Sequence, residues 1–269
     1  MPSSTPFFSI IVATHLRSTL LERALQSLRA QTFADFEVVV VADALDAGTA
    51  AVAAQWLRER DLFVKRSGAP GPADSRNLAL RLASGEWLMF LDDDDTFAPH
   101  HLETAHRRIT QPASDAERAA RLLFSDFEVV TENREQALPA PLSRTPVPLQ
   151  ANDVAGLHVK NFIPNSCLIY PVATVRTKRF DEALGLNEDW DFLLNVLRDS
   201  TLAYVPIHGP VIHQSPSEQA DRRGVQNEGL ILDVMPRIYR KWPAPTDALR
   251  ASRQALFATS GIMLSLDDL

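Results

Sequence analysis

An uninterrupted apolar run in this chain, Trp87-Leu88-Met89-Phe90-Leu91, passes directly into four aspartates, Asp92 to Asp95. Five large apolar residues without a polar interruption predict a strand that is buried on both faces, as strands of a parallel sheet are. The acids then follow the carboxyl end of that strand, which is the edge where open α/β sheets bind their ligands. Four like charges crowded there raise one another's pKa values unless a cation compensates them.

A divalent metal is the cation that this stretch predicts. Asp92 and Asp94 lie two residues apart, so in extended backbone their side chains share a face. Carboxylate oxygens are hard ligands that suit Mg²⁺ or Mn²⁺. The alternative is an acidic turn in water that caps the following helix.

Composition narrows the class of protein. The chain has 269 residues, of which 45% are hydrophobic, and this is enough for one large α/β domain or two small ones. Its net charge of −7, without a basic block, argues against a nucleic-acid partner. Cys167 is the single cysteine, which excludes an intramolecular disulfide and a cysteine-rich zinc site and favours a cytoplasmic location. The apolar run at 7–13 is too short for a membrane span, so we expect no transmembrane segment, although peripheral attachment at the inner membrane face is compatible.

Apolar patterns along the chain alternate between strands and helices. Strands are predicted at 7–13, 36–42, 61–65, 87–91, 122–131, 166–170 and 202–205. Helices are predicted at 19–30, 50–60, 73–84, 99–109, from 187 onward, at 226–241 and at 248–264. We therefore expect an α/β fold with a mixed, mostly parallel central sheet flanked by helices, followed by a C-terminal helical tail.

Local signals predict where some helices begin and end. Thr19 followed by Glu22 is a capping box for the first helix, and Gly85 is expected to be the C-cap of the third. No glycine-rich dinucleotide fingerprint or P-loop separates the first two strands. A metal would therefore have to do more of the work of binding phosphates.

Three further segments are predicted to lie at the surface. The histidines at 100, 101 and 106 fall on a polar helix face, and we expect them in water rather than on a metal. Prolines at 139, 141, 146 and 148 predict a long irregular loop. A second loop is expected to follow residue 205 and to carry His208, His213, Arg222 and Arg223.

Several short motifs occur in a fixed order along the chain. They are SIIVATHLR at 9–17 for S-I-I-x-P-T-Y-N-R, VVADAL at 40–45 for V-V-D-D-G-S, SRNLA at 75–79 for A-R-N-x-G, DDD at 92–94 for D-x-D, and EDWDF at 188–192. Each motif alone is weak, but together, at this spacing, they are specific. Over about Phe8 to Ser217 the chain resembles the family 2 glycosyltransferases, which have the GT-A fold, a single Rossmann-like domain.

The resemblance implies an enzyme: an inverting, metal-dependent and non-processive glycosyltransferase of the hexosyltransferase kind. It would move a sugar from a nucleotide-diphosphate sugar to an acceptor hydroxyl, in polysaccharide or glycoconjugate synthesis. Asp189 would be the catalytic base, and Asp92, Asp94 and His213 would hold Mn²⁺ or Mg²⁺. The residues implied in substrate binding are Thr14, His15, Arg17, Asp43, Arg76, Asp93, Glu188 and Arg222.

Individual roles follow from the same resemblance. Asp43 would accept a hydrogen bond from the nucleobase, in a pocket lined by Thr14, His15 and Arg76. Arg222 and Arg223 could clamp the diphosphate.

Three neighbouring acids would have supporting roles. Asp191 would cap its helix, Asp93 would face the sugar or solvent, and Asp95 would cap the segment that follows it.

Substrates and domain limits are also implied. The donor would carry UDP, with GDP or dTDP as alternatives, and the acceptor would be a saccharide or lipid-linked. Residues 1–98 would form the nucleotide-binding half and 99–224 the acceptor-binding half of one catalytic domain. Residues 225–269 would form the helical tail.

The sequence departs from the family pattern at several positions. His15 and Leu16 replace tyrosine and asparagine, Ala13 replaces proline, and Ala42 replaces the first aspartate of its pair. These changes leave open a noncatalytic module that binds nucleotide sugars. The Q-x-x-R-W element of processive polymerases is missing, which favours one sugar per encounter.

A phosphatase of the haloacid dehalogenase type is another alternative. Asp92 to Thr96 satisfies the D-x-D-x-T pattern of that class, in which Asp92 would be a nucleophile. That motif normally follows the first strand, whereas two predicted strands with their own motifs precede it here.

Overall fold

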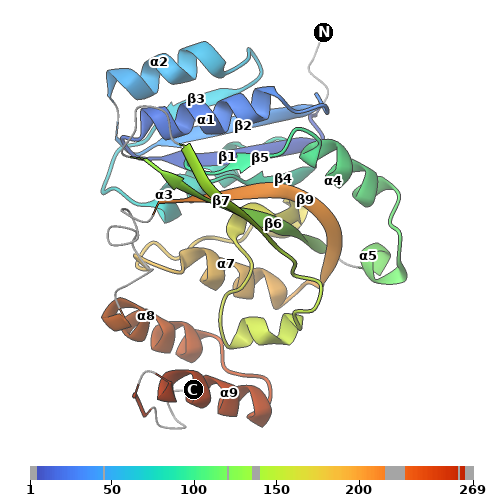
Figure 1. Ribbon diagram of the computed structural model, residues 1–269, viewed down its shortest axis with the longest axis vertical. Helices are drawn as coiled ribbons and strands as arrows, with labels where there is room; N and C mark the ends of the chain where they lie inside the picture. The colour runs from blue at the N-terminus through green and yellow to red at the C-terminus, as the bar shows by residue number, and fades with distance from the viewer. Residues whose placement is uncertain are drawn as a thin grey trace.

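One mixed sheet organises the fold (Figure 1). The computed structural model describes residues 5–44, 46–119, 121–134, 140–215, 228–259 and 261–263. Within these ranges the strands follow the order β3-β2-β1-β4-β8-β6-β9-β5, and β7 pairs with β6 beside this path. The predicted α/β class with a mixed central sheet is confirmed.

Four parallel strands form the first half of the sheet: β1 (Phe8–Thr14), β2 (Phe36–Ala42), β3 (Leu62–Lys65) and β4 (Trp87–Phe90). Every residue of β2 is buried, because both faces of this sheet are covered. The chain runs outward from β1 through β2 to β3 and then returns to β4 on the other side of β1. The carboxyl ends of β1 and β4 therefore flank a topological switch point, where open α/β sheets bind ligands.

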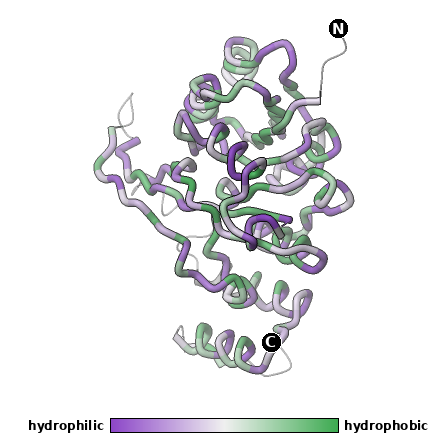
Figure 2. The backbone as a smooth tube through the Cα atoms, turned by 90° about the vertical axis from the view of Figure 1, so that its right-hand side faces the viewer, coloured by the Kyte–Doolittle hydropathy of each residue, from purple (hydrophilic) through white to green (hydrophobic). Residues whose placement is uncertain are grey.

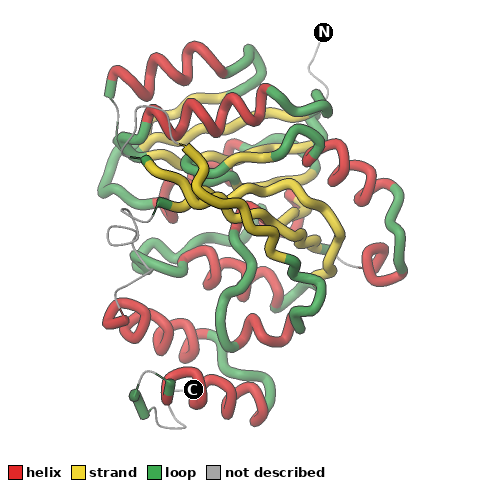
Figure 3. Tube along the Cα trace, in the orientation of Figure 1, coloured by secondary structure: helices red, strands yellow, loops and turns green. Residues whose placement is uncertain are grey.

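Helices cover the two faces of these strands in separate layers (Figure 3). On one face, α1 (Ser18–Arg29), α2 (Ala47–Trp56) and α4 (His101–Thr110) pack on residues such as Ile10. The opposite face belongs to α3 (Pro72–Leu82) and α7 (Glu188–Leu197). Successive side chains of a strand point to opposite faces, which is why the adjacent residue, Ile11, joins this second core.

The second half of the sheet contains β5 (Thr96–Phe97), β6 (Leu122–Asn133), β7 (Ala140–Val147), β8 (Leu168–Pro171) and β9 (Leu202–Gln214). β8 runs antiparallel to both β4 and β6, so β6 has the direction of β4. The end of β6 therefore comes to the same edge of the sheet as the four aspartates.

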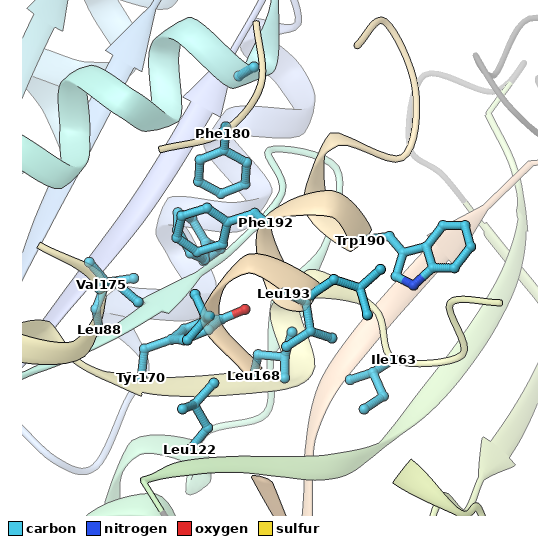
Figure 4. Close-up of a cluster of buried hydrophobic side chains, with 14 of the residues drawn as sticks. Leu88, Leu122, Ile163, Leu168, Tyr170, Val175, Phe180, Trp190, Phe192 and Leu193 are labelled. Atoms are coloured by element: carbon cyan, nitrogen blue, oxygen red, sulfur yellow. The ribbon is translucent and has the colours of Figure 1, made fainter. Parts of the chain in front are cut away.

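Short helices connect these strands: α5 (Asp115–Ala119), η1 (Val154–His158), η2 (Asn165–Cys167) and α6 (Val172–Val175). Beneath α7 lies an apolar cluster (Figure 4). In it Phe192 stacks on Phe180 with ring centroids 4.0 Å apart. This cluster fixes the helix that carries the predicted base against β8.

Two tail helices, α8 (Glu228–Lys241) and α9 (Asp247–Ala258), lie at the opposite end of the long axis from α2 (Figure 1). Hydrophilic and hydrophobic stretches alternate along them (Figure 2), as expected for helices that bury one side. Tyr239 and Phe257 belong to the same core cluster as α7. Within the described ranges, every helix falls short of the length and hydrophobicity that a membrane crossing needs.

Three expectations about the second half of the sheet differ from the structure. The proline-rich segment expected to be a loop contains β7, which pairs antiparallel with β6. The prolines of β7 are tolerated because edge strands accept proline. β6 was expected to be half exposed, but its first five residues are all buried, and partly exposed residues occur only in the rest of the strand. The last strand continues to Gln214, so His208 and His213 lie in β9 and not in a loop.

Both predicted caps were wrong as well. Arg17 is the N-cap of α1 without a side-chain bond, and Glu22 instead accepts a hydrogen bond from the indole of Trp56. The C-cap of α3 is Ala83. Gly85 is required for another reason, because a Cβ there would lie 2.8 Å from the backbone nitrogen of Ser9.

His101 is buried and not at the surface as expected. Its imidazole packs beside Phe97 and directly against Gly209, where a Cβ would overlap the ring. Burial lowers the pKa of His101 to about 3, so the ring stays neutral.

Candidate active site

A cleft of about 860 Å³ opens over the switch point. Its walls come from the loops after β1, β2 and β4, the N-termini of α3 and α7, and the segments around Pro164 and Arg134. The predicted site residues that line it are Thr14, His15, Arg17, Asp43, Arg76, Asp92, Asp93, Asp94, Glu188 and Asp189. His213 does not line it, and Arg222 and Arg223 lie outside the described residues.

The acidic turn at the end of β4 separates its four carboxylates by burial. The side chain of Asp92 is 40% exposed, whereas Asp93 is fully buried and Asp94 nearly so. The Thr14 hydroxyl donates a 2.7 Å hydrogen bond to Asp93 Oδ2, which ties the end of β1 to the turn. Asp93 was expected to face the sugar or solvent, and the solvent alternative is wrong because the residue is fully buried.

Arginines provide the positive charge that the acidic turn requires. Arg17 Nη2 lies 2.6 Å from Asp93 Oδ1, and Arg76 Nη2 lies 2.8 Å from Asp92 Oδ1. Burial raises the pKa of Asp93 to about 6 although Arg17 acts against it. Arginines thus provide part of the compensation that the sequence analysis assigned to a divalent metal.

A buried carboxylate behind the turn, Glu132 at the end of β6, organises the remaining cations. Both of its oxygens lie 2.8 Å from Arg23 Nη1, and Arg134 Nε also donates to it at 2.8 Å. Arg23 in turn donates to the backbone carbonyl of Asp94, and Arg134 Nη1 is 4.0 Å from the Asp94 carboxylate. These bonds hold the pKa of Glu132 near 2 despite the burial that acts to raise it.

His213 and Asp95 belong to this supporting network. The ring nitrogens of His213 contact Glu132 Oε2 at 3.0 Å and Thr96 Oγ1 at 3.0 Å. Asp95 accepts a hydrogen bond from the His213 backbone, so it holds β9 instead of capping the segment that follows it. With its ring engaged away from the cleft, we do not assign His213 to a metal.

Asp43 and His15 form a pair at the far end of the cleft. His15 Nδ1 lies 2.6 Å from Asp43 Oδ1, while Asp43 Oδ2 accepts from the backbone N–H of Gly71 at 2.8 Å. The imidazole is about half exposed, and the carboxylate is 5% exposed. The histidine that departs from the family pattern thus directly contacts the acid expected to bind the nucleobase.

Arg76 connects the acidic turn to the start of α7. Its guanidinium donates to Asp92 and, at 2.6 Å, to Glu188 Oε1. Asp189 follows Glu188 and lines the same cleft. Burial, with the Glu188 charge adding to it, raises the pKa of Asp189 to about 7, which suits a general base at neutral pH.

The tail helices anchor α7 from below. Asp191 is fully buried and accepts hydrogen bonds from Trp242 Nε1 at 2.7 Å and Lys241 Nζ at 2.8 Å. Asp191 was expected to cap the helix, and instead it binds the end of α8 to the turn that carries Asp189. Sequence patterns could not show this contact, because its partners lie about fifty residues apart.

The acidic turn fits a metal that is shared with a phosphate group. Among the described residues, no three His, Cys, Asp or Glu side chains form a group that could hold a metal by themselves. Mg²⁺ is usually held by one or two carboxylates together with substrate phosphates. Asp92 and Asp94 both line the cleft and supply such carboxylates.

Arg23, Glu132 and Arg134 belong to none of the motifs and were not predicted as site residues. One signal was present, because Glu132 and Arg134 follow directly on the predicted strand 122–131 and charged residues at strand ends mark ligand edges in α/β sheets. The direction of that strand was not predictable from its residues alone. Its pairing with β8 and β9 is what brings it to this edge.

Comparisons with known proteins agree on one family. The family model described as "Glycosyl transferase family 2" matches residues 9–170. Succinoglycan biosynthesis protein ExoW of Rhizobium meliloti is 28% identical over 264 residues, which cover 89% of this chain and 82% of ExoW.

Solved structures show the same GT-A fold. Residues 1–349 of S. aureus TarS in complex with UDP-GlcNAc superpose with a TM-score of 0.66 at 19% identity, covering 93% of this chain and 71% of that one. This chain spans 42% of the longer TarS chain. Mannosyltransferase PcManGT from Pyrobaculum calidifontis, in complex with GDP-Man and Mn²⁺, gives a TM-score of 0.54 at 18% identity, covering 98% of this chain and 78% of that one.

Proposed function

The chain belongs to glycosyl transferase family 2, and we propose that it moves a sugar from a nucleotide-diphosphate sugar to an acceptor hydroxyl. The proposed transfer inverts the configuration of the sugar, uses a divalent metal and adds one sugar per encounter. The observation that carries this proposal is the cleft at the switch point. It brings together the acidic turn, Arg76 and the raised-pKa carboxylate of Asp189. The proposed leaving-group site and the proposed proton acceptor would thus share one cavity.

The donor nucleotide would bind between the end of β2 and the start of α3. Asp43 offers only acceptor atoms, which suit the ring N–H of uracil, thymine or guanine. His15 holds one oxygen of that carboxylate and faces the cleft, so it would determine how the base approaches. UDP is our first choice, with GDP or dTDP as alternatives, and likeness to chains solved with UDP-GlcNAc and GDP-Man supports this range.

The diphosphate would lie over the acidic turn. Asp92 and Asp94 would hold Mn²⁺ or Mg²⁺ there, and such an ion stabilises the charge that develops on a departing diphosphate. Arg17, which is half exposed at the cleft, could exchange its contact with Asp93 for a phosphate oxygen. Arg134 lines the same wall and would add a second cation.

Asp189 would remove the proton of the acceptor hydroxyl. A carboxylate with a pKa near 7 is a better proton acceptor than an ordinary aspartate and is still ionised in about half of the molecules at neutral pH. Glu188 is held by Arg76 and would help to place the acceptor. The haloacid-dehalogenase alternative loses its support, because the chain belongs to another family.

For the acceptor we propose a saccharide or a lipid-linked saccharide in polysaccharide synthesis, in line with the similarity to ExoW. We further propose that residues 1–98 bind the nucleotide, that 99–224 bind the acceptor, and that the tail from 225 supports α7.

A thermal-shift panel tests the donor and the metal together. A ligand that binds only the folded state raises the melting temperature by mass action. We expect one of UDP, GDP or dTDP to raise it with Mn²⁺ and to do so less without Mn²⁺. CDP serves as the control, because the cytosine ring offers an acceptor where Asp43 needs a donor. No shift with any nucleotide, or a shift that ignores Mn²⁺, would contradict the proposal.

A further inference from the structure

Asn165 stands out among the cleft residues that no motif marks. It begins η2, directly after Pro164, and both residues line the cleft. The residue is only 3% exposed, and both atoms of its amide are buried. The same cleft is lined by Gly185 to Asp189 and by the acidic turn.

Neither amide atom of Asn165 has a hydrogen-bond partner among the residues that the structure describes. Leaving a buried polar group unpaired costs about 1–3 kcal/mol, so such groups are rare in folded proteins and call for an explanation. Asn77 shows the ordinary case. Its amide donates to the Phe180 carbonyl and to Glu182 and accepts from the Phe180 backbone N–H.

Strand pairing brings Asn165 to the edge of the sheet where the acidic turn lies. In the antiparallel register of β4 and β8, Met89 faces Ile169. Four residues forward from Met89 is Asp93, and four residues back from Ile169 is Asn165. The amide therefore lies at the same edge as the acidic turn, in the cavity that also contains Asp189.

Two nearby buried hydroxyl groups provide a comparison for this amide. Ser166 Oγ and Tyr170 OH are also buried without a partner among the described residues, but neither residue lines the cleft. Figure 4 shows Tyr170 among the apolar side chains beneath α7. Of these three groups only Asn165 borders a cavity in which a substrate could satisfy it.

We propose that the Asn165 amide is a sugar-recognition site, with its Nδ2–H donating to one ring substituent and its Oδ1 accepting from a sugar hydroxyl. An amide that offers both a donor and an acceptor matches hydroxyl groups, which do both, whereas a phosphate only accepts. Asn165 lines the same cleft as the acidic turn, where the diphosphate is proposed to bind, and Asp189, the proposed catalytic base, and the sugar rings of donor and acceptor would meet in that cleft. This inference rests on the proposed function.

The test uses Asn165→Leu in the full chain, because leucine keeps the branching at Cγ and replaces both polar atoms by methyl groups. Calorimetry with Mn²⁺ compares a nucleoside diphosphate with its sugar conjugates: UDP with UDP-glucose and UDP-N-acetylglucosamine, and GDP with GDP-mannose. Asn77→Leu is the matched control, since it loses hydrogen bonds that belong to the fold.

We expect Asn165→Leu to melt at or above the wild-type temperature, because an apolar group of the same shape replaces an unpaired polar one. Asn77→Leu should melt lower. The variant should bind the nucleoside diphosphate normally and its sugar conjugate about tenfold more weakly, if the amide contacts the donor sugar. If it contacts the acceptor instead, donor binding stays normal and the acceptor KM rises about tenfold.

Two results would overturn the inference. One is a melting temperature that falls as far as in Asn77→Leu, which would make Asn165 a structural residue. The other is sugar-nucleotide affinity and acceptor KM both within twofold of the wild type. Asn165→Ala, which adds no atoms, decides in the same way if the leucine variant does not fold. If the wild type binds none of these sugar nucleotides, the proposed function fails and the inference with it; if it binds one and the variant binds it equally, only the inference fails.

Discussion

Replacing Trp242 by phenylalanine should slow transfer although Trp242 does not line the cleft. The change removes one indole N–H from the buried Asp191 carboxylate and leaves an aromatic ring in place. Lys241 keeps its 2.8 Å contact with the other oxygen, so Asp191 stays partly compensated. Because Asp191 lies two residues after Asp189 on the first turn of α7, the loss loosens the turn that carries the proposed base.

The expected losses of melting temperature and kcat follow from the hydrogen bond between Trp242 and Asp191. A hydrogen bond to a charged group contributes about 1.5–3 kcal/mol, and for a chain of this size each kcal/mol lowers the melting temperature by about 2–4 °C. We therefore expect a loss of about 3–12 °C. A displacement of about 1 Å at a reacting group can cost up to about 100-fold in rate, so kcat should fall by about 10- to 100-fold.

Trp56→Phe is the matched control. Trp56 donates its indole N–H to Glu22 Oε1 at 3.1 Å, on the other face of the sheet from α7. Melting curves, donor affinity by calorimetry and kcat are measured for both variants. We expect normal donor affinity in both and a fall in kcat only in Trp242→Phe. If Trp242→Phe loses stability but keeps the kcat of the control, the tail does not position the base.

Two other perturbations probe the charges of the cleft. Burial, with the Glu188 charge beside it, raises the pKa of Asp189 to about 7, and only the ionised carboxylate accepts a proton. We therefore expect kcat/KM to rise tenfold per pH unit below about pH 7 and to level off above it. A flat profile of kcat/KM from pH 5 to 8 would contradict the assignment of Asp189 as the base. Glu132→Gln keeps the shape of the side chain but removes the negative charge that Arg23 and Arg134 share. We expect Mn²⁺-dependent nucleotide affinity, measured by calorimetry, to fall about tenfold. Unchanged affinity would show that the acidic turn holds its position without the charge of Glu132.

Apolar runs predicted the first half of the fold well because they belong to strands buried on both faces. The predicted and observed limits of β2 coincide at Phe36–Ala42, and β1 is displaced by one residue. The second half was harder, because β7 is an edge strand that reads as a proline-rich loop. β9 continues through His208 and His213, whose polar side chains hid the strand pattern.

The residues of the candidate site likewise fall into a predicted and an unpredicted group. Motif residues such as Arg76, Asp92 and Asp189 do share one cleft, as their order along the chain suggested. The support behind them could not be predicted, because it depends on contacts across the sheet. Glu132 reaches Arg23, more than a hundred residues earlier, and no local pattern records that distance.

Asp189→Asn is the measurement that tests the central claim most directly. Its pKa is higher in the folded than in the unfolded chain, so the protonated carboxyl stabilises the fold at low pH and this contribution is lost as the pH rises through about 7. The asparagine variant should therefore melt at or above the wild-type temperature at pH 8 and bind the nucleotide sugar normally. Its kcat at pH 8 should fall by at least about 100-fold, the range that a general base contributes. Transfer at a near wild-type rate by this folded, donor-binding variant would show that Asp189 is not the base.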